Sequence, residues 1–336
     1  MAGGVTFNVI DAKDMATTEL YGNALAALAE KHPDIVGITA DLAKSTKIGV
    51  LGEKYPDRLY NMGIAEQNMM GVAAGMALGG LTPFVTTFAT FASMRACEQI
   101  RTDICYQNLN VKVIGTHAGV SFGTAGTTHH CTEDLGIMRT MANLTILCPA
   151  DGMETVNALE AAYAYKGPVY IRINRGYDKP VYTSTDYPFE IGKAITLHEG
   201  SDMTIIACGA AVFRAREAAK ILEKSDGIRV RVLNMHTIKP LDTDAVLKAV
   251  KDTRRIITVE DHNIIGGLGS AVADVIAESG KGCAFKKLGI PDIFSIIGLQ
   301  EDIMAYYGYD ENGILKAARE LIGKAFEEVE DWGDEV

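Results

Sequence analysis

Short apolar segments rich in β-branched residues alternate with longer helix-like segments along most of the chain. This alternation is typical of parallel β-sheets that are covered by helices on both faces. In the first half, the pattern predicts strands at 35–39, 83–87, 111–115, 144–148 and 169–173, alternating with helices at 15–31, 66–78, 91–106, 132–141 and 153–165. We therefore expect an α/β fold with a doubly wound parallel sheet in this half.

The alternation lapses in a polar, proline-containing stretch and then resumes. Such a stretch is typical of a linker between domains. The second series predicts strands at 203–207, 229–233, 256–259 and 285–288 and helices at 211–223, 242–250 and 269–277. We therefore predict two doubly wound α/β domains, at 1–178 and 193–327, joined by a linker at 179–192 and followed by an acidic, solvated tail at 328–336.

The stretch from 67 to 94 contains no charged residue, which raises the question of a membrane span. It includes polar residues and a proline, however, and has no unbroken apolar segment of about 18 residues.

Within this stretch, Gly71, Gly75 and Gly79 recur every four residues and share one face of the helix expected at 66–78. Each interior glycine costs about 1 kcal/mol relative to alanine, so we expect another backbone against this face, within the fold or across a subunit interface.

Composition narrows the choice of partners and compartment. The 336 residues are 48% hydrophobic and 22% charged, with a net charge of -11 and no lysine or arginine cluster, so nucleic acid and anionic membranes are unfavourable partners. The six cysteines form no CxxC pair, and the first residues lack the charged-then-apolar order of a signal peptide. We expect a protein of the reducing cytoplasm that does not associate with membranes.

Polar side chains concentrate in three loops that follow predicted strands, and the carboxyl ends of parallel strands meet at one edge of a sheet. The loops contain Asp41 and Ser45, then His117, His129 and His130, then Arg172 and Arg175. A glycine-rich surface loop with solvated histidines and a zinc site are alternatives, but adjacent histidines lack the usual spacing of zinc ligands. The favoured interpretation is a set of polar groups that converge on a hydroxylated substrate.

Glu66 stands at the start of the helix predicted at 66–78. The helix dipole favours a negative charge there, so a carboxylate that serves only the helix start is one interpretation and a functional carboxylate is the other. The surrounding GIAEQN is followed in order by TFATF, THAG, GTTHH and NR. Together these segments resemble the C-terminal portion of transketolase, its pyrimidine-binding and C-terminal domains, which some bacteria and archaea encode as a separate subunit. The resemblance covers essentially the whole chain.

The resemblance implies thiamin diphosphate as cofactor. Glu66 matches the glutamate that hydrogen-bonds N1′ of the aminopyrimidine ring and so promotes removal of the proton from the thiazolium C2 carbon. An uncharged sequence around it supplies the dry pocket that strengthens such a proton relay. Phe88 and Phe91 match the aromatic pair around the aminopyrimidine, although ordinary core positions are the alternative. Asp41 and Leu42 match the segment beside the thiazolium ring.

The resemblance also implies transfer of a two-carbon ketol unit from a ketose to an aldose. His117 and His129 match histidines that contact substrate hydroxyls and assist proton transfer, and His130 stands where the family usually has glutamine. Ser45 and Arg175 match groups that hold the sugar phosphate, for which a guanidinium is well suited.

Two positions depart from the family pattern. Thr18 replaces a phosphate-contacting arginine, and Ala125 replaces an aspartate that recognises a sugar hydroxyl. The departures concern the sugar rather than the thiamin chemistry. We therefore expect a ketose other than the standard pentose phosphates, for example a sulfonated, deoxy or branched one.

The GDG…Asn motif that holds the diphosphate and its divalent cation is missing from the chain. No metal ligand is therefore predicted here, and the chain is expected to hold half of a site. The missing half implies an N-terminal partner subunit that binds Mg²⁺ or Ca²⁺, in a symmetric assembly such as α2β2.

Two rival functions share part of this pattern. The β subunits of 2-oxoacid dehydrogenases carry a segment similar to GIAEQ, but His117, His129 and Arg175 favour sugars over 2-oxoacids. A non-catalytic regulatory subunit that kept the fold is the other rival, and the retained Glu66 and Phe88 argue against it.

Overall fold

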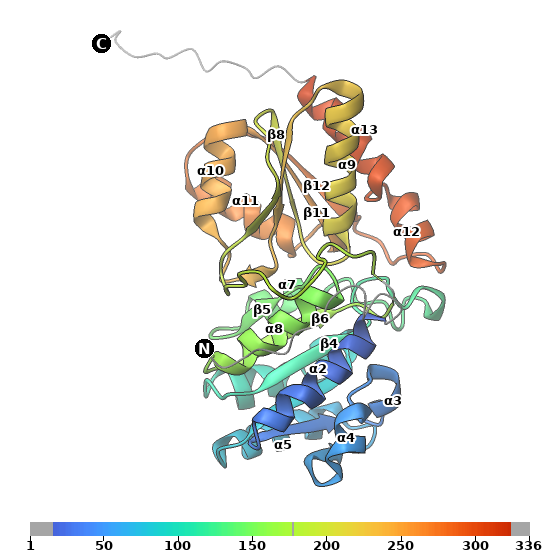
Figure 1. Ribbon diagram of the computed structural model, residues 1–336, viewed down its shortest axis with the longest axis vertical. Helices are drawn as coiled ribbons and strands as arrows, with labels where there is room; N and C mark the ends of the chain where they lie inside the picture. Colours follow the sequence, from blue (N-terminus) through green and yellow to red (C-terminus); the bar gives the residue numbers. More distant parts are fainter. Residues whose placement is uncertain (1–15, 177, 324–336) are drawn as a thin grey trace, which may run out of the picture.

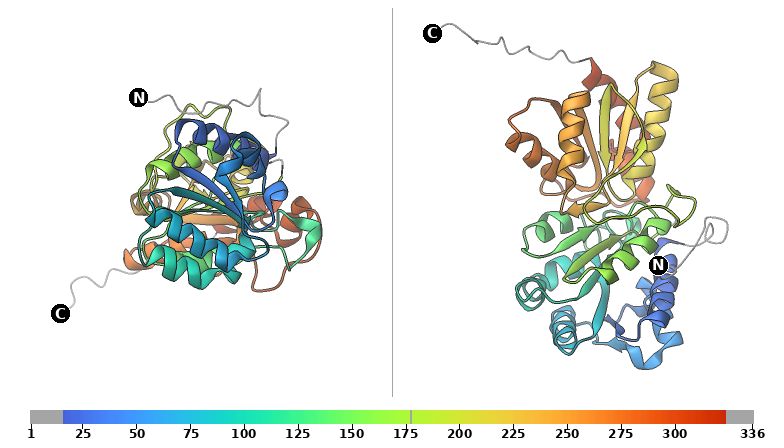
Figure 2. Two further views of the ribbon diagram at one scale, coloured as in Figure 1. Left: turned by 90° about the horizontal axis from the view of Figure 1, so that it is seen from below. Right: turned by 60° about the vertical axis from the view of Figure 1, so that its left-hand side comes forward.

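The computed structural model describes residues 16–176 and 178–323, and the acidic tail predicted at 328–336 lies outside the described residues. Two α/β domains are stacked along the long axis of the molecule, the first half of the chain below and the second half above in Figure 1. Each domain has one sheet with helices on both faces, and Figure 2 shows this layering from two further directions. The predicted class, α/β with two doubly wound domains, is confirmed.

The first domain is built on a seven-stranded sheet with the order β10-β5-β6-β4-β3-β1-β2, which is parallel except for β10. The strands are β1 (Ile35–Thr39), β2 (Leu59–Asn61), β3 (Thr82–Phe88), β4 (Lys112–Thr116), β5 (Thr145–Leu147), β6 (Val169–Ile173) and β10 (Thr237–Lys239). Successive residues face opposite layers: Phe84 packs with the core of α2 and α8, and Val85 with the core of α5. Both faces are therefore apolar, and the strands appear in the sequence as apolar runs.

The helices of the first domain are α2 (Thr17–Lys31), α3 (Ala43–Thr46), α4 (Gly49–Lys54), η1 (Pro56–Arg58), α5 (Glu66–Leu78), η2 (Phe91–Arg95), α6 (Cys97–Gln99), η3 (Ile100–Cys105), η4 (Gly123–Ala125), α7 (Asp134–Arg139) and α8 (Gly152–Ala164). The single helix predicted at 91–106 is interrupted, because η2 and η3 are π-helical. Ser93 Oγ donates to the Ala89 carbonyl at 2.8 Å, so a side chain competes for the helical backbone there. Such π segments often mark functional sites.

The second domain has a five-stranded sheet with the order β12-β11-β8-β9-β7, in which β7 is antiparallel at the edge. Its strands are β7 (Ile195–His198), β8 (Met203–Ala207), β9 (Val230–Asn234), β11 (Arg255–Asn263) and β12 (Ala284–Ile290), and its helices are α9 (Ala211–Asp226), α10 (Thr243–Thr253), α11 (Leu268–Glu278), α12 (Gln300–Tyr307) and α13 (Glu311–Ile322). Helices α9 and α13 cover one face, and α10 and α11 cover the other (Figure 1). The sequence pattern missed β7 because this edge strand is only partly buried, and it missed α12 and α13.

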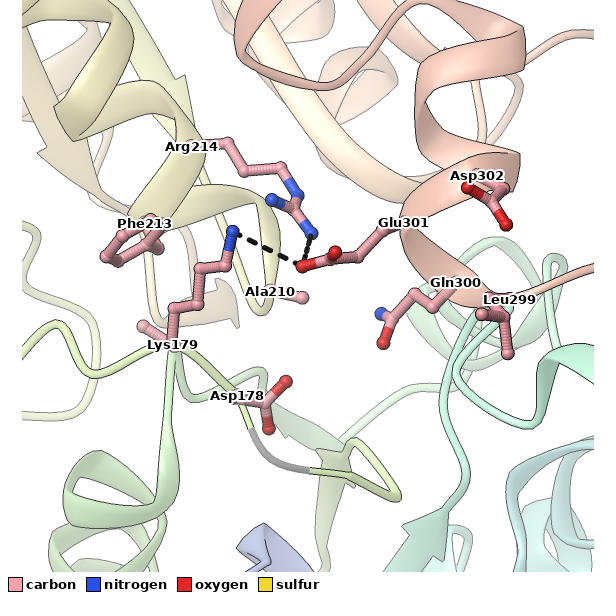
Figure 3. A pocket seen from close by; sticks show the side chains of 10 residues that line it. Asp178, Lys179, Ala210, Phe213, Arg214, Leu299, Gln300, Glu301 and Asp302 are labelled. Atoms are coloured by element: carbon pink, nitrogen blue, oxygen red, sulfur yellow. Dashed lines mark ion pairs between the residues drawn. The ribbon is translucent and has the colours of Figure 1, made fainter. Parts of the chain in front are cut away.

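The two domains are joined by more than the linker. Strand β10 comes from the second half of the chain but pairs antiparallel with β5 of the first sheet, Thr237 opposite Leu147. One continuous apolar core extends from beneath α5 to α10 and α11. A hollow of about 420 Å³ also lies between the domains, where Glu301 of α12 pairs with Lys179 at 3.2 Å and with Arg214 of α9 at 3.7 Å (Figure 3). Through β10, the second domain therefore adds the last strand to the sheet of the first domain.

No backbone of the described residues packs against the glycine face of α5 at Gly71 or Gly75. A Cβ at Gly75 would meet nothing within 4 Å, and one at Gly71 would have its nearest neighbour, Asp103 Oδ2, at 3.7 Å. Ile64 and Leu78, at the two ends of the helix, are 77% and 66% exposed. The expectation of a backbone packed on Gly71 and Gly75 within the fold is therefore wrong for the described residues, and the subunit-interface interpretation stays a prediction.

Asp151 generates a prediction about stability. Its buried carboxylate caps α8 through Glu154 N at 2.9 Å and accepts from Val181 N at 2.6 Å and Tyr182 N at 2.9 Å. Asp151→Ala should lower the free energy of unfolding by at least about 2 kcal/mol, because a cap is lost and buried amides lose their acceptor. The control is Asp310→Ala, which removes only the cap of α13 and should cost about 1 kcal/mol. Urea titration measures both, and equal losses would contradict the account.

Candidate active site

Rings predicted as site residues lie together at the carboxyl ends of β3 and β4. Phe88 ends β3 and Phe91 begins η2, while His117 and His129 belong to residues 117–131, here called the histidine loop. The Phe88 and His117 rings are stacked with centroids 4.5 Å apart. The His129 ring lies 5.9 Å from Phe88 and 5.5 Å from Phe91. Parallel pairing of Phe88 with Thr116 explains why His117, the next residue, reaches this position.

Phe122 completes the cluster and was missed in the sequence. Its ring centroid is 4.7 Å from that of His117 and 5.3 Å from that of His129. The guanidinium carbon of Arg175 lies 4.6 Å from the Phe122 centroid, which is a cation–π contact. The only signal in the sequence was the position of this aromatic residue between two candidate histidines.

His117 is a buried histidine with a lowered pKa. The residue is 2% exposed and has a φ of 60°, a left-handed conformation that few L-residues adopt. Burial, followed by the charges of Arg175 and His129, lowers the pKa of His117 to about 3. Its Nδ1 has no hydrogen-bond partner among the described residues. The ring is therefore neutral at neutral pH.

The other two candidate histidines differ in orientation. His129 is partly exposed, and its Nδ1 lies 2.9 Å from Thr128 Oγ1. His130 is buried, and its Nε2 lies 2.8 Å from the carbonyl oxygen of Gly123. The structure brings His117 and His129 together with the phenylalanines but not His130, whose ring ties one part of the histidine loop to another.

A cleft of about 540 Å³ opens beside His117, and it carries several cationic groups. Its lining includes Thr18, Lys44, Ser45, Lys47, His117, Ser121, Phe122 and Arg175. Lys47 has its Nζ 3.2 Å from Glu19 Oε1, and the backbone N–H of Arg175 donates to Ser121 Oγ at 3.3 Å. Ser45 and Arg175 were predicted from the sequence, whereas the two lysines were not. The arrangement suits an anionic group.

Glu66 lies on the other side of the aromatic cluster. It is 4% exposed at the first position of α5 and lines a second hollow of about 470 Å³. Arg95 Nη1 donates to Glu66 Oε1 at 3.0 Å, and the guanidinium carbon of Arg95 lies 3.7 Å from the centroid of the Phe91 ring. Arg95 was missed in the sequence because the π-helical η2, not a regular helix, sets its direction. The carboxylate and the aromatic cluster are thus neighbours.

Asp41 and Leu42 follow β1 at the same edge of the sheet. Asp41 is exposed, has a φ of 60°, and its backbone N–H donates to Asn61 Oδ1 at 2.9 Å. The same Asn61 oxygen accepts from Gly63 N at 3.0 Å, just before α5. Asn61, another residue that the sequence analysis missed, therefore connects the turn at Asp41 with the start of α5.

The two departures from the family pattern occupy different places. Thr18 is 3% exposed, lines the cleft, and donates through Oγ1 to the Arg175 carbonyl at 3.1 Å. Ala125 lies in η4 and is not among the residues that line the cleft. Arg172 is buried and bonded to Asp134 at 2.9 Å, so it does not face the cleft as a free cation.

Within residues 16–176 and 178–323, no group of three or more His, Cys, Asp or Glu side chains is arranged to hold a metal ion. The same part of the chain contains no helix of the length and apolar character needed to cross a membrane.

Comparison of the sequence with known protein families gives the same division into two domains. Residues 13–177 match the transketolase pyrimidine binding domain, and residues 192–314 match the transketolase C-terminal domain. These two ranges bracket the predicted linker.

Individual relatives extend the likeness over nearly the whole chain. An apulose-4-phosphate transketolase subunit from Phocaeicola vulgatus is 38% identical over 92% of this chain and 98% of that protein. The 6-deoxy-6-sulfo-D-fructose transketolase subunit of Clostridium sp. strain MSTE9 is 37% identical over 90% of this chain and 93% of that protein. A solved structure described as a split gene transketolase, inactive β4 tetramer, is 40% identical, covers 95% of this chain and 99% of that chain, and superposes with a TM-score of 0.82. The chain belongs to the transketolase family, in which it corresponds to the C-terminal subunit of a split enzyme.

Proposed function

We propose that this chain, with an N-terminal partner subunit, forms a thiamin-diphosphate-dependent transketolase that transfers a two-carbon ketol unit from a ketose to an aldose. The observation that carries the proposal is the order of groups across the first domain: the buried Glu66, then the cluster of aromatic and histidine rings, then the cationic cleft. A carboxylate beside aromatic rings suits an aminopyrimidine, and a cationic cleft suits a sugar with an anionic group.

Glu66, Phe88 and Phe91 would hold the aminopyrimidine ring of thiamin diphosphate, and Asp41 and Leu42 would border its thiazolium ring. The fit rests on Glu66, a buried carboxylate that faces a hollow and whose partner Arg95 has a side chain 49% exposed and therefore free to move aside. When bound, the cofactor supplies the electron sink for cleavage of the carbon–carbon bond beside the ketose carbonyl. The Mg²⁺ or Ca²⁺ that accompanies the cofactor would be held by ligands of the partner subunit, and it would neutralise charge on the diphosphate.

The chain's own residues would orient the substrate and move protons. Glu66 would hold a proton at N1′ of the aminopyrimidine, in surroundings whose dryness strengthens that interaction. His117 is neutral at neutral pH, because its pKa is lowered to about 3, and its ring nitrogen can accept a hydrogen bond from a substrate hydroxyl. His129 is partly exposed beside it and would contact the substrate from the entrance.

The cleft favours a ketose that carries an oxyanion at its far end. Ser45 and Arg175 would bind this group, and Lys44 and Lys47 supply positive charge near Thr18, where the family pattern has an arginine. The relatives from Phocaeicola vulgatus and Clostridium are named for a phosphorylated and a sulfonated ketose. Both groups are tetrahedral oxyanions, so a phosphate or a sulfonate fits the same lysines.

The partner would carry the GDG…Asn motif, in a symmetric assembly with two copies of each chain. The uncovered glycine face of α5 supports a subunit contact close to Glu66, since Met94 and Tyr106 are also exposed, at 48% and 83%. The similar solved structure, described as an inactive tetramer of β chains, supports the idea that a chain of this kind assembles without acquiring activity alone.

The proposed function predicts that the isolated chain has no ketol transfer activity. Activity should appear when the chain is mixed with an N-terminal subunit that carries the GDG…Asn motif, because each chain would hold half of the cofactor site. The measurement is a mass-spectrometric screen of ketose donors and aldose acceptors with and without the partner. Strong turnover by the purified chain alone, or none with the partner over a broad set of ketoses, would refute the proposal.

Glu66→Gln should keep the fold and the pairing of subunits but lower kcat of the assembled enzyme by at least about 100-fold. The amide preserves the shape and removes the acid, and a positioned proton-transfer group contributes at least this factor. Steady-state kinetics measures the loss, with Glu53→Gln on the exposed side of α4 as the matched control. A Glu66 variant within a few-fold of wild type would reduce this residue to a helix-start carboxylate.

Lys47→Met should raise KM for the anionic ketose about tenfold while changing kcat less. A hydrogen bond between charged groups contributes about 1.5–3 kcal/mol, and its loss falls on binding when the anion is held equally in ground and transition states. The kinetics are compared for a ketose phosphate, a sulfonated ketose and a ketose without an anionic group. Lys54→Met, in the exposed last turn of α4, is the control. An equal effect on all three ketoses would show that Lys47 does not bind the anion.

A further inference from the structure

The histidine loop is held at its base by the C-terminal domain. The backbone N–H of Val120 donates to both carboxylate oxygens of Asp261, at 3.3 and 3.2 Å. The preceding residue, Gly119, has a φ of +54°, and a Cβ there would lie 2.1 Å from Asp261 Oδ2. Only glycine therefore allows the loop backbone to approach this carboxylate so closely. Asp261 belongs to β11 of the second sheet, so the contact crosses between domains.

The Asp261 carboxylate accepts hydrogen bonds from three residues that are distant from it in the sequence. Besides Val120 N, it accepts from Tyr309 Oη at 2.9 Å and from Gln300 Nε2 at 3.3 Å. Asp261 and Tyr309 are 1% and 0% exposed. A buried carboxylate is tolerated only when hydrogen bonds satisfy its oxygens, so the three donors fix one orientation of the side chain. The loop is thereby attached to a rigid part of the C-terminal domain.

Further contacts close the other side of the loop. Arg172 Nη2 donates to the carbonyl oxygens of Cys131, at 3.0 Å, and of Asp261, at 2.8 Å. Asn263, two residues after Asp261, donates its backbone N–H to the Thr132 carbonyl at 2.8 Å. Both ends of the histidine loop therefore meet the same stretch of β11.

We propose that Asp261 is a positioning residue for the substrate cleft, acting through Val120 on the residues that bind the sugar. The inference rests on the proposed function for its substrate. The segment directly after Val120 contains Ser121, which accepts from Arg175 N at 3.3 Å, and Phe122, whose ring centroid is 4.6 Å from the Arg175 guanidinium carbon. Asp261 therefore sets the place of Arg175 at the anionic end of the cleft, although Asp261 is not among the residues that line this cleft.

The contacts made by Asp261 lead to residues of the substrate cleft and not to Glu66, which would activate the cofactor. Glu66 begins α5 and is bonded to Arg95, neither of which belongs to the histidine loop. Loss of Asp261 should therefore weaken binding of a substrate that reaches Arg175 more than binding of a short donor that contacts only His117 and His129 of the histidine loop. A general loss of stability would affect both donors alike.

The neighbouring residue, Glu260, provides a matched control. It is an equally buried carboxylate on the same strand, but it accepts from Leu268 N at 2.6 Å and Gly269 N at 2.7 Å at the start of α11. Glu260→Ala should therefore disturb α11 and leave the histidine loop in place, while Asp261→Ala should do the reverse.

The first experiment is hydrogen–deuterium exchange on the full chain, read by mass spectrometry, and it needs no activity. Asp261→Ala should raise exchange at least about fivefold in peptides from 117–131, because a hydrogen bond to the loop backbone is lost and local opening becomes easier. Glu260→Ala should raise exchange at 264–278 and leave 117–131 unchanged. Unchanged exchange at 117–131 in Asp261→Ala would overturn the proposal.

The second experiment compares two donors in the assembled enzyme. Asp261→Ala should raise KM about tenfold for a ketose phosphate, the cost expected for one lost buried hydrogen bond, and change KM for hydroxypyruvate, a three-carbon ketol donor, by less than about twofold. Asp261→Asn should restore most of the binding, because its amide oxygen can still accept from Val120 N while its NH₂ faces a reversed Gln300 amide. It also serves if Asp261→Ala fails to fold.

The outcomes separate the two proposals. Equal losses with both donors, or an Asp261→Asn variant as impaired as Asp261→Ala, would overturn the positioning role. If the wild-type assembly turns over no donor at all, the proposed function fails, and the exchange experiment alone decides whether Asp261 holds the histidine loop.

Discussion

The buried guanidinium of Arg172 links the first sheet, the histidine loop and the C-terminal domain through its hydrogen bonds. It is 2% exposed near the carboxyl end of β6, and its Nε donates to both carboxylate oxygens of Asp134, at the start of α7, at 3.0 and 2.9 Å. A charge at this depth is tolerated only when it is paired and fully hydrogen-bonded. Such a pair adds little net stability, but removal of one partner typically costs about 3–5 kcal/mol. The elements around Arg172 are therefore held in one arrangement by the need to satisfy it.

The local charges of the cleft oppose the charge of the whole protein. The chain has a net charge of -11, which repels an anionic sugar at long range. Lys44, Lys47 and Arg175 reverse the sign inside the cleft, and burial together with the charge of Arg175 keeps the His117 ring next to them neutral. Under the proposed function, an anion would therefore be selected within a few ångströms of the lysines, where pairing is less screened by salt than at the open surface.

Much of the fold could be predicted because buried parallel strands produce apolar runs, and much of the site because its residues follow those strands. Phe88, His117 and Arg175 were found in this way, from family motifs at the ends of β3, β4 and β6. Lys47 could not be predicted, since its place in the cleft depends on a left-handed turn with φ of 65° and on a pairing with Glu19. Strand β10 has only three residues, which is too short a segment for its hydrophobic pattern to predict a strand.

The direction of Arg95 likewise depended on a π-helical segment that hydrophobic periodicity does not reveal. His130 shows a different effect of local backbone geometry. Its neighbour in the sequence lies in the aromatic cluster, but the tight turn at 126–130 sends the two side chains to different places. Adjacent residues in a glycine-rich loop therefore cannot be assigned a common role from the motif alone.

Strand β10 restricts where a gene for this fold can be divided. Because a segment of the C-terminal domain pairs with β5, a polypeptide that ended at the linker would leave β5 as an open, apolar sheet edge, which is a site for aggregation. The opposite border of the same sheet is the short, partly exposed strand β2, which presents no comparable apolar edge. The hydrogen bonds of a three-residue strand therefore favour keeping these two domains on one polypeptide.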